Sequence, residues 1–176
     1  MKKFVLGIVY ALIALVVIFM GGAYVLPGEV VVERQITIAA PPDKVFAIVG
    51  DLKRFREFAP WAEIDPGLHY KFEGPETGIG QKMSWTSDNP QIGSGSQTVV
   101  DYQPNKRFAT TLDFGEMGEA IGYFDFSPAG NDTKVIWGFK SLLRNPLERW
   151  MGLLFDRWIG ADYEKGLAKL KALAEK

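Results

Sequence analysis

Apolar side chains recur at every second position over about seventy residues, from Leu68 to Phe139. Such alternation is typical of strands that bury one face. Turn signals separate the runs, among them Gly74-Pro75, Asp88-Asn89-Pro90 and Pro104-Asn105. Connections this short predict antiparallel neighbours, because parallel strands need crossovers of a dozen residues or more. We therefore expect six antiparallel strands in this stretch.

The chain ends in an amphipathic segment that can cover such a sheet. Asn145-Pro146 supplies a cap and a first-turn proline, and apolar residues then recur at helical spacing from Leu147 to Leu173. Gly160 is expected to bend or briefly interrupt this helix, since glycine costs about 1 kcal/mol against alanine there. A sheet with one apolar face must have that face covered, so we expect the helix to lie across it.

The residues before the alternating stretch complete the predicted α+β order. Val31–Ala39 alternates as a half-buried first strand, and Pro41-Pro42-Asp43 then opens a short helix. Asp51 is a plausible cap for a second short helix that closes at Pro60-Trp61. Arg34 shares the parity of the apolar strand residues, so it is either a snorkelling side chain at the strand end or a polar group in a cavity.

An uncharged apolar run precedes the first strand. It extends over 23 residues, from Phe4 to Leu26, and follows Lys2-Lys3. As a helix it would measure roughly 34 Å, enough to cross a hydrocarbon core of about 30 Å. We predict that residues 4–26 span a membrane, with an anchor at residues 1–27 and one soluble domain at residues 28–176.

The charges around this run indicate an orientation. The lysines before it and Glu29 and Glu33 after it favour a cytoplasmic N-terminus, with the domain on the periplasmic or another extracytoplasmic side of the cell membrane. A cleaved signal peptide is the alternative, with Gly21-x-Ala23 as a weak cleavage site. The run is, however, longer than the 7 to about 15 apolar residues expected of a signal peptide.

Composition narrows the functional classes. A net charge of -1 in 176 residues provides no field that would attract nucleic acid, so we expect no nucleic-acid partner. The absence of cysteine excludes disulfides, thiolate metal sites and a cysteine nucleophile. The single histidine, His69, shares parity with polar neighbours and leaves little basis for an imidazole site. We expect neither a metal nor a cofactor.

The residues with inward parity are unusually aromatic. They form either a filled core or the wall of a pocket, and periodicity alone does not separate the two. Our candidates for ligand contact are Phe46, Trp61, Met83, Trp85, Val99, Phe108, Leu112, Phe124, Trp137, Phe139, Trp150, Leu154 and Trp158.

A smaller set of polar residues could face the same interior. These are Gln81, Gln97, Thr110, Arg34, Tyr123 and Asp125. No pair of acids at a useful spacing and no G-x-S-x-G motif is present, so the sequence identifies no catalytic residue.

Several segments resemble a known superfamily. They are VERQITIAAPPDKVFAIVGDLKRFREFAPW, GPETGIG followed by MSW, TKVIW, and IGADYEKGLAKLKALAE. Together they are similar to the SRPBCC superfamily of START-like proteins, and more narrowly to its polyketide cyclase/dehydrase-type branch, over about residues 30–175. The resemblance implies a helix-grip fold, in which a curved seven-stranded antiparallel sheet wraps around the C-terminal helix. It also implies an apolar ligand cavity between sheet and helix, and some members are enzymes.

Three functions remain open at this point. The first is a membrane-anchored module that holds a hydrophobic small molecule, lipid-like or aromatic, in the cavity. The second is a cyclase or dehydratase, which would need a desolvated carboxyl or tyrosine facing the cavity. The third is an envelope protein-interaction domain with a filled interior, whose protein partner the sequence does not identify.

Overall fold

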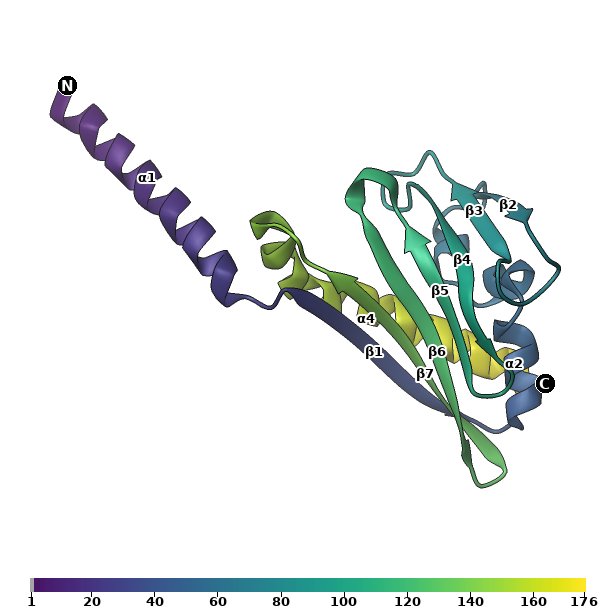
Figure 1. Cartoon of the computed structure of the whole chain (residues 1–176). Coiled ribbons are helices and arrows are strands. Elements are labelled where there is room, and N and C mark those ends of the chain that lie inside the picture. The colour runs from purple at the N-terminus through teal and green to yellow at the C-terminus, as the bar shows by residue number, and fades with distance from the viewer. Residues whose placement is uncertain (1) are drawn as a thin grey trace.

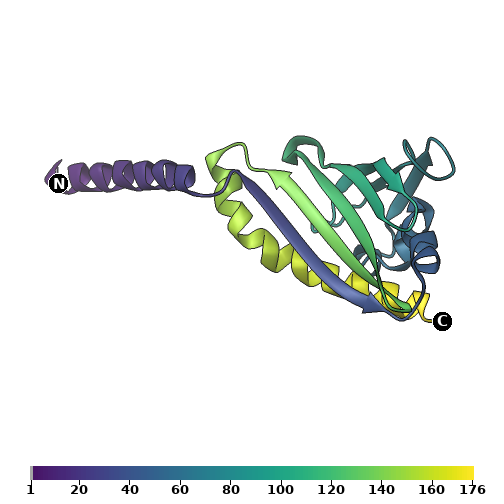
Figure 2. The same cartoon turned by 60° about the horizontal axis from the view of Figure 1, so that its bottom comes forward.

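The computed structural model describes residues 2–176 and shows a sheet that curves around a long helix (Figure 1). The sheet has seven antiparallel strands in the order β1-β7-β6-β5-β4-β3-β2. The helix, α4 (Pro146–Ala174), lies across its concave face (Figure 2). A separate apolar helix, α1 (Lys2–Val25), extends away from this domain. The predicted helix-grip fold is therefore confirmed.

The strands follow the sequence alternation. They are β1 (Glu29–Ile38), β2 (His69–Glu73), β3 (Lys82–Thr86), β4 (Ser94–Gln103), β5 (Arg107–Asp113), β6 (Glu119–Ala129) and β7 (Asp132–Leu142). The pairing of β4 with β5 shifts between Val99 and Asp101, so Val100 is a bulge residue. Bulges bend a strand and increase its twist, which contributes to the curvature of the sheet.

Short helices connect β1 to β2. Both predicted helices are present, as α2 (Pro42–Val49) and the 3₁₀ helix η1 (Leu52–Glu57), and Asp51 caps η1 by accepting a hydrogen bond from the Lys53 backbone N–H at 2.9 Å. The structure adds one further turn, α3 (Trp61–Ile64), which the sequence analysis did not predict. A second 3₁₀ turn, η2 (Gly115–Met117), joins β5 to β6.

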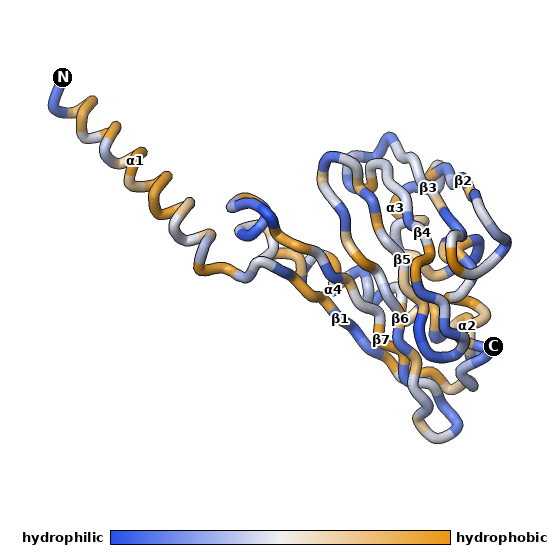
Figure 3. Tube along the Cα trace, viewed as in Figure 1, coloured by the Kyte–Doolittle hydropathy of each residue, from blue (hydrophilic) through white to orange (hydrophobic). Residues whose placement is uncertain are grey.

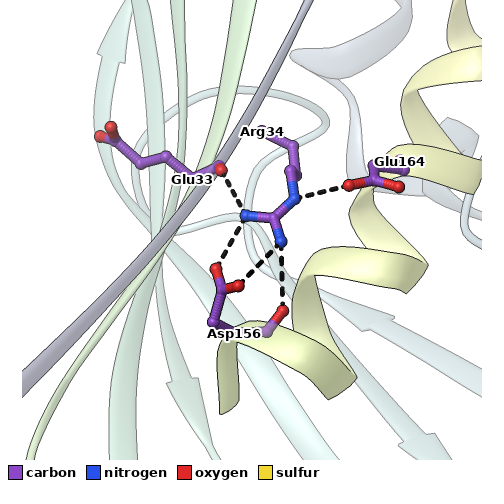
Figure 4. Close-up of polar contacts among 4 residues, drawn as sticks. All are labelled: Glu33, Arg34, Asp156 and Glu164. Atoms are coloured by element: carbon purple, nitrogen blue, oxygen red, sulfur yellow. Dashed lines mark hydrogen bonds and ion pairs between the residues drawn. The ribbon is translucent and has the colours of Figure 1, made fainter. Parts of the chain in front are cut away.

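Gly160 does not interrupt α4, in contrast to the expectation from sequence. The helix is continuous, and the glycine instead makes room for Arg34, because a Cβ at position 160 would collide with the Arg34 guanidinium. Arg34 Nη1 lies 2.8 Å from Asp156 Oδ1, and Arg34 Nε lies 2.7 Å from Glu164 Oε1 (Figure 4). Asp156, Gly160 and Glu164 follow each other at four-residue intervals, so they share one stripe of the helix.

Arg34 therefore fits neither expectation for it, since it joins β1 to α4 by charge-assisted hydrogen bonds. The hydrogen bond from Arg34 holds the pKa of the Asp156 carboxyl below its usual value. The Glu33 side chain points to the opposite face of the strand (Figure 4). This contact fixes the edge of the sheet to the middle of the helix.

The close approach of α4 to the sheet gives a first prediction. A methyl group at Gly166 would collide with Trp137 Cζ3 and lie 3.1 Å from Trp137 Cη2. We expect Gly166→Ala to lower the free energy of unfolding, because overpacking costs about 1–3 kcal/mol, which outweighs the helix-propensity gain of about 1 kcal/mol. Denaturant unfolding of the full chain in detergent measures the change in the free energy of unfolding.

The control is Ala168→Gly, at an exposed position of the same helix. This substitution should lower the free energy of unfolding by about 1 kcal/mol, through helix propensity alone. A Gly166→Ala variant more stable than the parent chain would show that the helix and Trp137 are not in close contact.

Candidate functional site

A cavity of about 280 Å³ lies between the concave face of the sheet and the middle of α4. Its walls come from β2 to β7, from η1 and α3, and from the loop between β3 and β4. Nine of the thirteen residues that the sequence analysis named as ligand contacts line it. They are Trp61, Met83, Trp85, Phe108, Leu112, Phe124, Trp137, Phe139 and Trp158.

The hollow exists because two small residues face each other on neighbouring strands. Thr110 on β5 pairs with Gly122 on β6, and both line the cavity. Their neighbours on the same face, Leu112 and Phe124, are large. A Cβ on Gly122 would lie 3.3 Å from Leu112 Cδ1, so even a methyl group there would begin to fill the space.

Stacked aromatic rings form the floor. Trp137 stacks on Tyr163 of α4 with ring centroids 4.1 Å apart, and on Phe124 at 4.7 Å. Phe58, which is fully buried, meets the Trp137 ring edge-on at 5.8 Å. Interlocked rings of this kind leave little freedom, so the floor is a rigid apolar surface.

Four of the named candidates lie away from the cavity. Phe46 packs against Tyr102 at 5.2 Å and Phe126 at 5.4 Å in the solid core beneath α2. Val99 is buried but does not line the cavity. Trp150 and Leu154 belong to the first turns of α4, beyond the cavity. Alternation identifies the face of a strand, and helical spacing identifies the face of a helix. Neither shows how far along the interior a residue lies.

The structure also brings residues to the wall that were not among the named contacts. They are Phe55, Leu68, Tyr70, Gln91, Ile92, Gln97, Thr110, Phe114, Gly122, Ile159, Asp162 and Tyr163. Tyr163 follows Ile159 at the four-residue spacing of one helix face, so the helix pattern contained a signal for this pair. Gln91 and Ile92 lie in a loop, where periodicity gives no signal.

Two buried polar residues on the wall are incompletely hydrogen-bonded. Thr110 Oγ1 donates to Gln97 Oε1 over a long 3.4 Å, and Gln97 Nε2 lies 4.0 Å from the Met83 sulfur. A thioether is a weak acceptor, and an amide nitrogen carries two donors. Gln97 therefore retains donor capacity for an oxygen in the cavity.

The other polar candidates serve structural contacts. Gln81 is buried and bonds to the Leu52 backbone N–H at 3.1 Å and the Glu76 carbonyl at 2.6 Å. Tyr123 donates to Glu33 Oε1 at 2.6 Å, and Asp125 pairs with Arg107. None of these residues lines the cavity.

Tyr163 and Asp162 are the ionisable groups that α4 contributes to the wall. Burial raises the pKa of the Tyr163 hydroxyl, so this group keeps its proton at neutral pH. Asp162 lies closer to solvent and is 3.7 Å from the Lys165 ammonium. The site is thus equipped to enclose an apolar molecule and to donate hydrogen bonds to it.

A curved antiparallel sheet closed by a C-terminal helix, with a hollow between them, defines a START-like helix-grip protein. The sequence profile of the family described as "Polyketide cyclase / dehydrase and lipid transport" matches residues 29–175. The chain belongs to this family, and the predicted membership of the SRPBCC superfamily is confirmed.

Solved structures show the same fold. A protein from Chromobacterium violaceum aligns with a TM-score of 0.61 at 16% identity, covering 84% of this chain and 99% of that one. The di-domain ARO/CYC protein StfQ of the steffimycin biosynthetic pathway gives 0.63 at 16% identity, covering 84% of this chain and 51% of its own. Ara h 8.0201 gives 0.60 at 13%, covering 84% and 98%. No curated protein matches the sequence.

The buried Tyr163 hydroxyl generates a second prediction. Its folded-state pKa is raised above the unfolded value of about 10, so its contribution to stability is complete below about pH 10 and is lost as pH rises through the folded pKa. We expect Tyr163→Phe to lose less stability than the parent chain between about pH 8 and pH 11. Denaturant unfolding of both proteins at each pH measures the free energy of unfolding. The difference between the two proteins at the lower pH is the reference. Equal losses in both proteins would contradict the prediction.

Proposed function

We propose that residues 28–176 bind a hydrophobic small molecule, lipid-like or aromatic, in the cavity between sheet and α4. We further propose that residues 4–26 span the cell membrane, with the N-terminus in the cytoplasm and the domain on the periplasmic or another extracytoplasmic side. The observation that carries the first proposal is the apolar, aromatic-walled hollow itself. The family description, which includes lipid transport, supports it.

The size and walls of the cavity indicate the kind of ligand. Its volume of about 280 Å³ is near the lower end of the roughly 300–1,000 Å³ usual for ligand pockets. A compact molecule, such as one with two or three fused rings or a chain of moderate length, suits this space. Gln97 supplies a donor in an otherwise apolar wall, so we expect the ligand to carry a carbonyl or another oxygen acceptor.

The membrane proposal rests on α1. This helix has 24 residues, is long and apolar enough to cross a bilayer, and is almost entirely exposed (Figure 3). Exposed apolar side chains on every face of a helix need a nonpolar environment. A signal sequence near the N-terminus can pass the same test of length and composition, although its apolar run is usually shorter. The mass of the mature protein distinguishes the two.

An enzyme of the cyclase or dehydratase kind is the second candidate. The family description and the presence of Asp162 and Tyr163 on the wall favour it. General acid or base catalysis requires a pKa near the working pH, whereas burial moves the pKa of Tyr163 away from neutrality. We therefore place binding first. An interaction domain without a ligand is supported less well, because the interior is hollow.

Ligand binding is tested on the full chain purified in detergent. Organic extraction and mass spectrometry should recover a small hydrophobic molecule, and 2-acetylnaphthalene should quench the tryptophan fluorescence. Gly122→Val, which places a branched side chain in the hollow, should weaken this binding. Val100→Ile, which adds a methyl group on the exposed bulge of β4, should not. Equal binding by all three proteins would show that the cavity is not the site.

A third prediction concerns Gln97. Gln97→Met should lower the affinity for 2-acetylnaphthalene about two- to tenfold, because a hydrogen bond contributes roughly 0.5–1.5 kcal/mol. The affinity for 2-isopropenylnaphthalene, in which a CH₂ group replaces the carbonyl oxygen and the shape is kept, should change little. Gln103→Met, at an exposed position of the same strand, is the control. Equal losses for ketone and hydrocarbon would contradict a hydrogen bond from this residue.

A further inference from the structure

The first turns of α4 carry an apolar stripe that the domain leaves uncovered. Leu147, Met151, Leu154 and Trp158 recur at helical spacing and are between 42% and 61% exposed. In contrast, the buried residues of α4 all lie from Gly160 onward. The stripe covers three turns of one helix face, and isolated exposed apolar residues do not form such a pattern.

The same turns of α4 are attached to the end of α1. Trp150 Nε1 donates to the Phe19 carbonyl at 3.0 Å, and the two rings stack with centroids 5.9 Å apart. Arg149 Nη1 donates to the carbonyls of Ala23 and Leu26 at 3.2 and 3.4 Å, which satisfies backbone oxygens at the C-terminus of α1. The start of α4 is therefore fixed beside the last turns of the apolar helix.

The connection between α1 and the domain is also short. Only Leu26, Pro27 and Gly28 separate α1 from β1, and three residues extend over at most about 11 Å. The Gly28 carbonyl also accepts a hydrogen bond from the Leu143 backbone N–H at 2.8 Å, just before α4 begins. When α1 spans a bilayer, the first turns of α4 thus lie at the bilayer surface.

The position of the Trp150–Phe19 contact along α1 agrees with a start of α4 at the bilayer surface. Phe19 lies six residues before the end of α1, which corresponds to roughly 9 Å along the helix axis. In the proposed span, Trp150 therefore lies near the end of α1 that faces the domain, on the side of the interface between lipid chains and water where tryptophan is enriched in membrane proteins.

The stripe leads from this interface to the cavity. Trp158 is its last residue and also lines the cavity, next to Ile159. One turn further along the same face, the polar Asp162 and Lys165 end the apolar surface. Because Trp158 is half exposed and also lines the cavity, the cavity wall reaches the protein surface there, at the end of the stripe that lies away from α1.

We propose that the first three turns of α4 rest in the lipid interface of the bilayer that α1 spans, and that they hold the cavity opening at the lipid surface. A hydrophobic ligand then passes between bilayer and cavity along Leu147, Met151 and Leu154. This inference deepens the proposed function and rests on α1 as a membrane span. The occupant of the stripe is lipid, and not a second copy of the chain.

The chain contains no cysteine, so single-cysteine variants allow a direct test. Met151→Cys reports on the stripe, and Val100→Cys, on an apolar residue 46% exposed on β4, is the matched control. Each full-length variant is labelled with an environment-sensitive fluorophore and reconstituted into phosphatidylcholine vesicles. Lipids that carry a nitroxide on the headgroup or deep in the acyl chain then act as quenchers.

The label at Met151 should shift its emission to the blue and lose intensity with the headgroup-proximal quencher, while the label at Val100 should respond to neither quencher. Unquenched emission from both labels in vesicle-bound protein would overturn the proposal. A blue shift at Met151 without quenching, together with crosslinked dimers, would also overturn it, because a second chain would then cover the stripe. The quenching experiment uses no ligand, so its outcome does not depend on whether the cavity binds one.

Discussion

The stack of Trp137 on Tyr163 is the contact on which the arrangement of this domain depends. It joins the centre of the sheet to the centre of α4, and Gly166 allows the helix to approach closely enough for the rings to meet. On one side of the stack, Phe46 and Phe126 meet edge to face with ring centroids 5.4 Å apart, and Leu170 is fully buried. On the other side Thr110 and Gly122 leave the hollow. The stack thus divides one apolar face into a core that stabilises and a cavity that can bind.

A hollow of this kind forfeits contacts that a filled core would make, so other interactions must hold the helix over it. Arg34 provides them at the edge of the sheet, because its guanidinium lies across Gly160 between two carboxylates of α4. The contact is directional, which an apolar contact is not, and it sets the position of the helix along β1. The Trp137–Tyr163 stack and the Arg34 contact each depend on a glycine in α4. Gly166 leaves room for the Trp137 ring, and Gly160 leaves room for the Arg34 guanidinium.

Most of the fold could be predicted from the sequence, because alternation and helical spacing are repeated many times and each repeat reinforces the others. The cavity could be predicted only in part. Parity placed Trp85, Phe108 and Phe139 correctly on the inner face of the sheet. The helix pattern placed Phe46 inward equally well, but Phe46 packs against Tyr102 and Phe126 and does not line the cavity. What creates space is the small pair Thr110 and Gly122, and a small residue leaves no mark in a hydrophobic pattern. The role of Trp150 could not be predicted either, because its partner Phe19 is 131 residues away in the chain.

The link between α1 and the domain bears on how the proposed apolar ligand would reach the cavity. Each CH₂ group that leaves an apolar environment for water costs about 0.8 kcal/mol, so a ligand that suits this cavity faces a barrier of several kcal/mol if it must cross water. A freely tethered domain would not remove that barrier, since its opening would face the bilayer only part of the time. Here the three-residue connection and the contacts of Arg149 and Trp150 with α1 restrict the orientation. In the proposed arrangement, α1 sets the orientation of the cavity relative to the bilayer as well as tethering the domain to it.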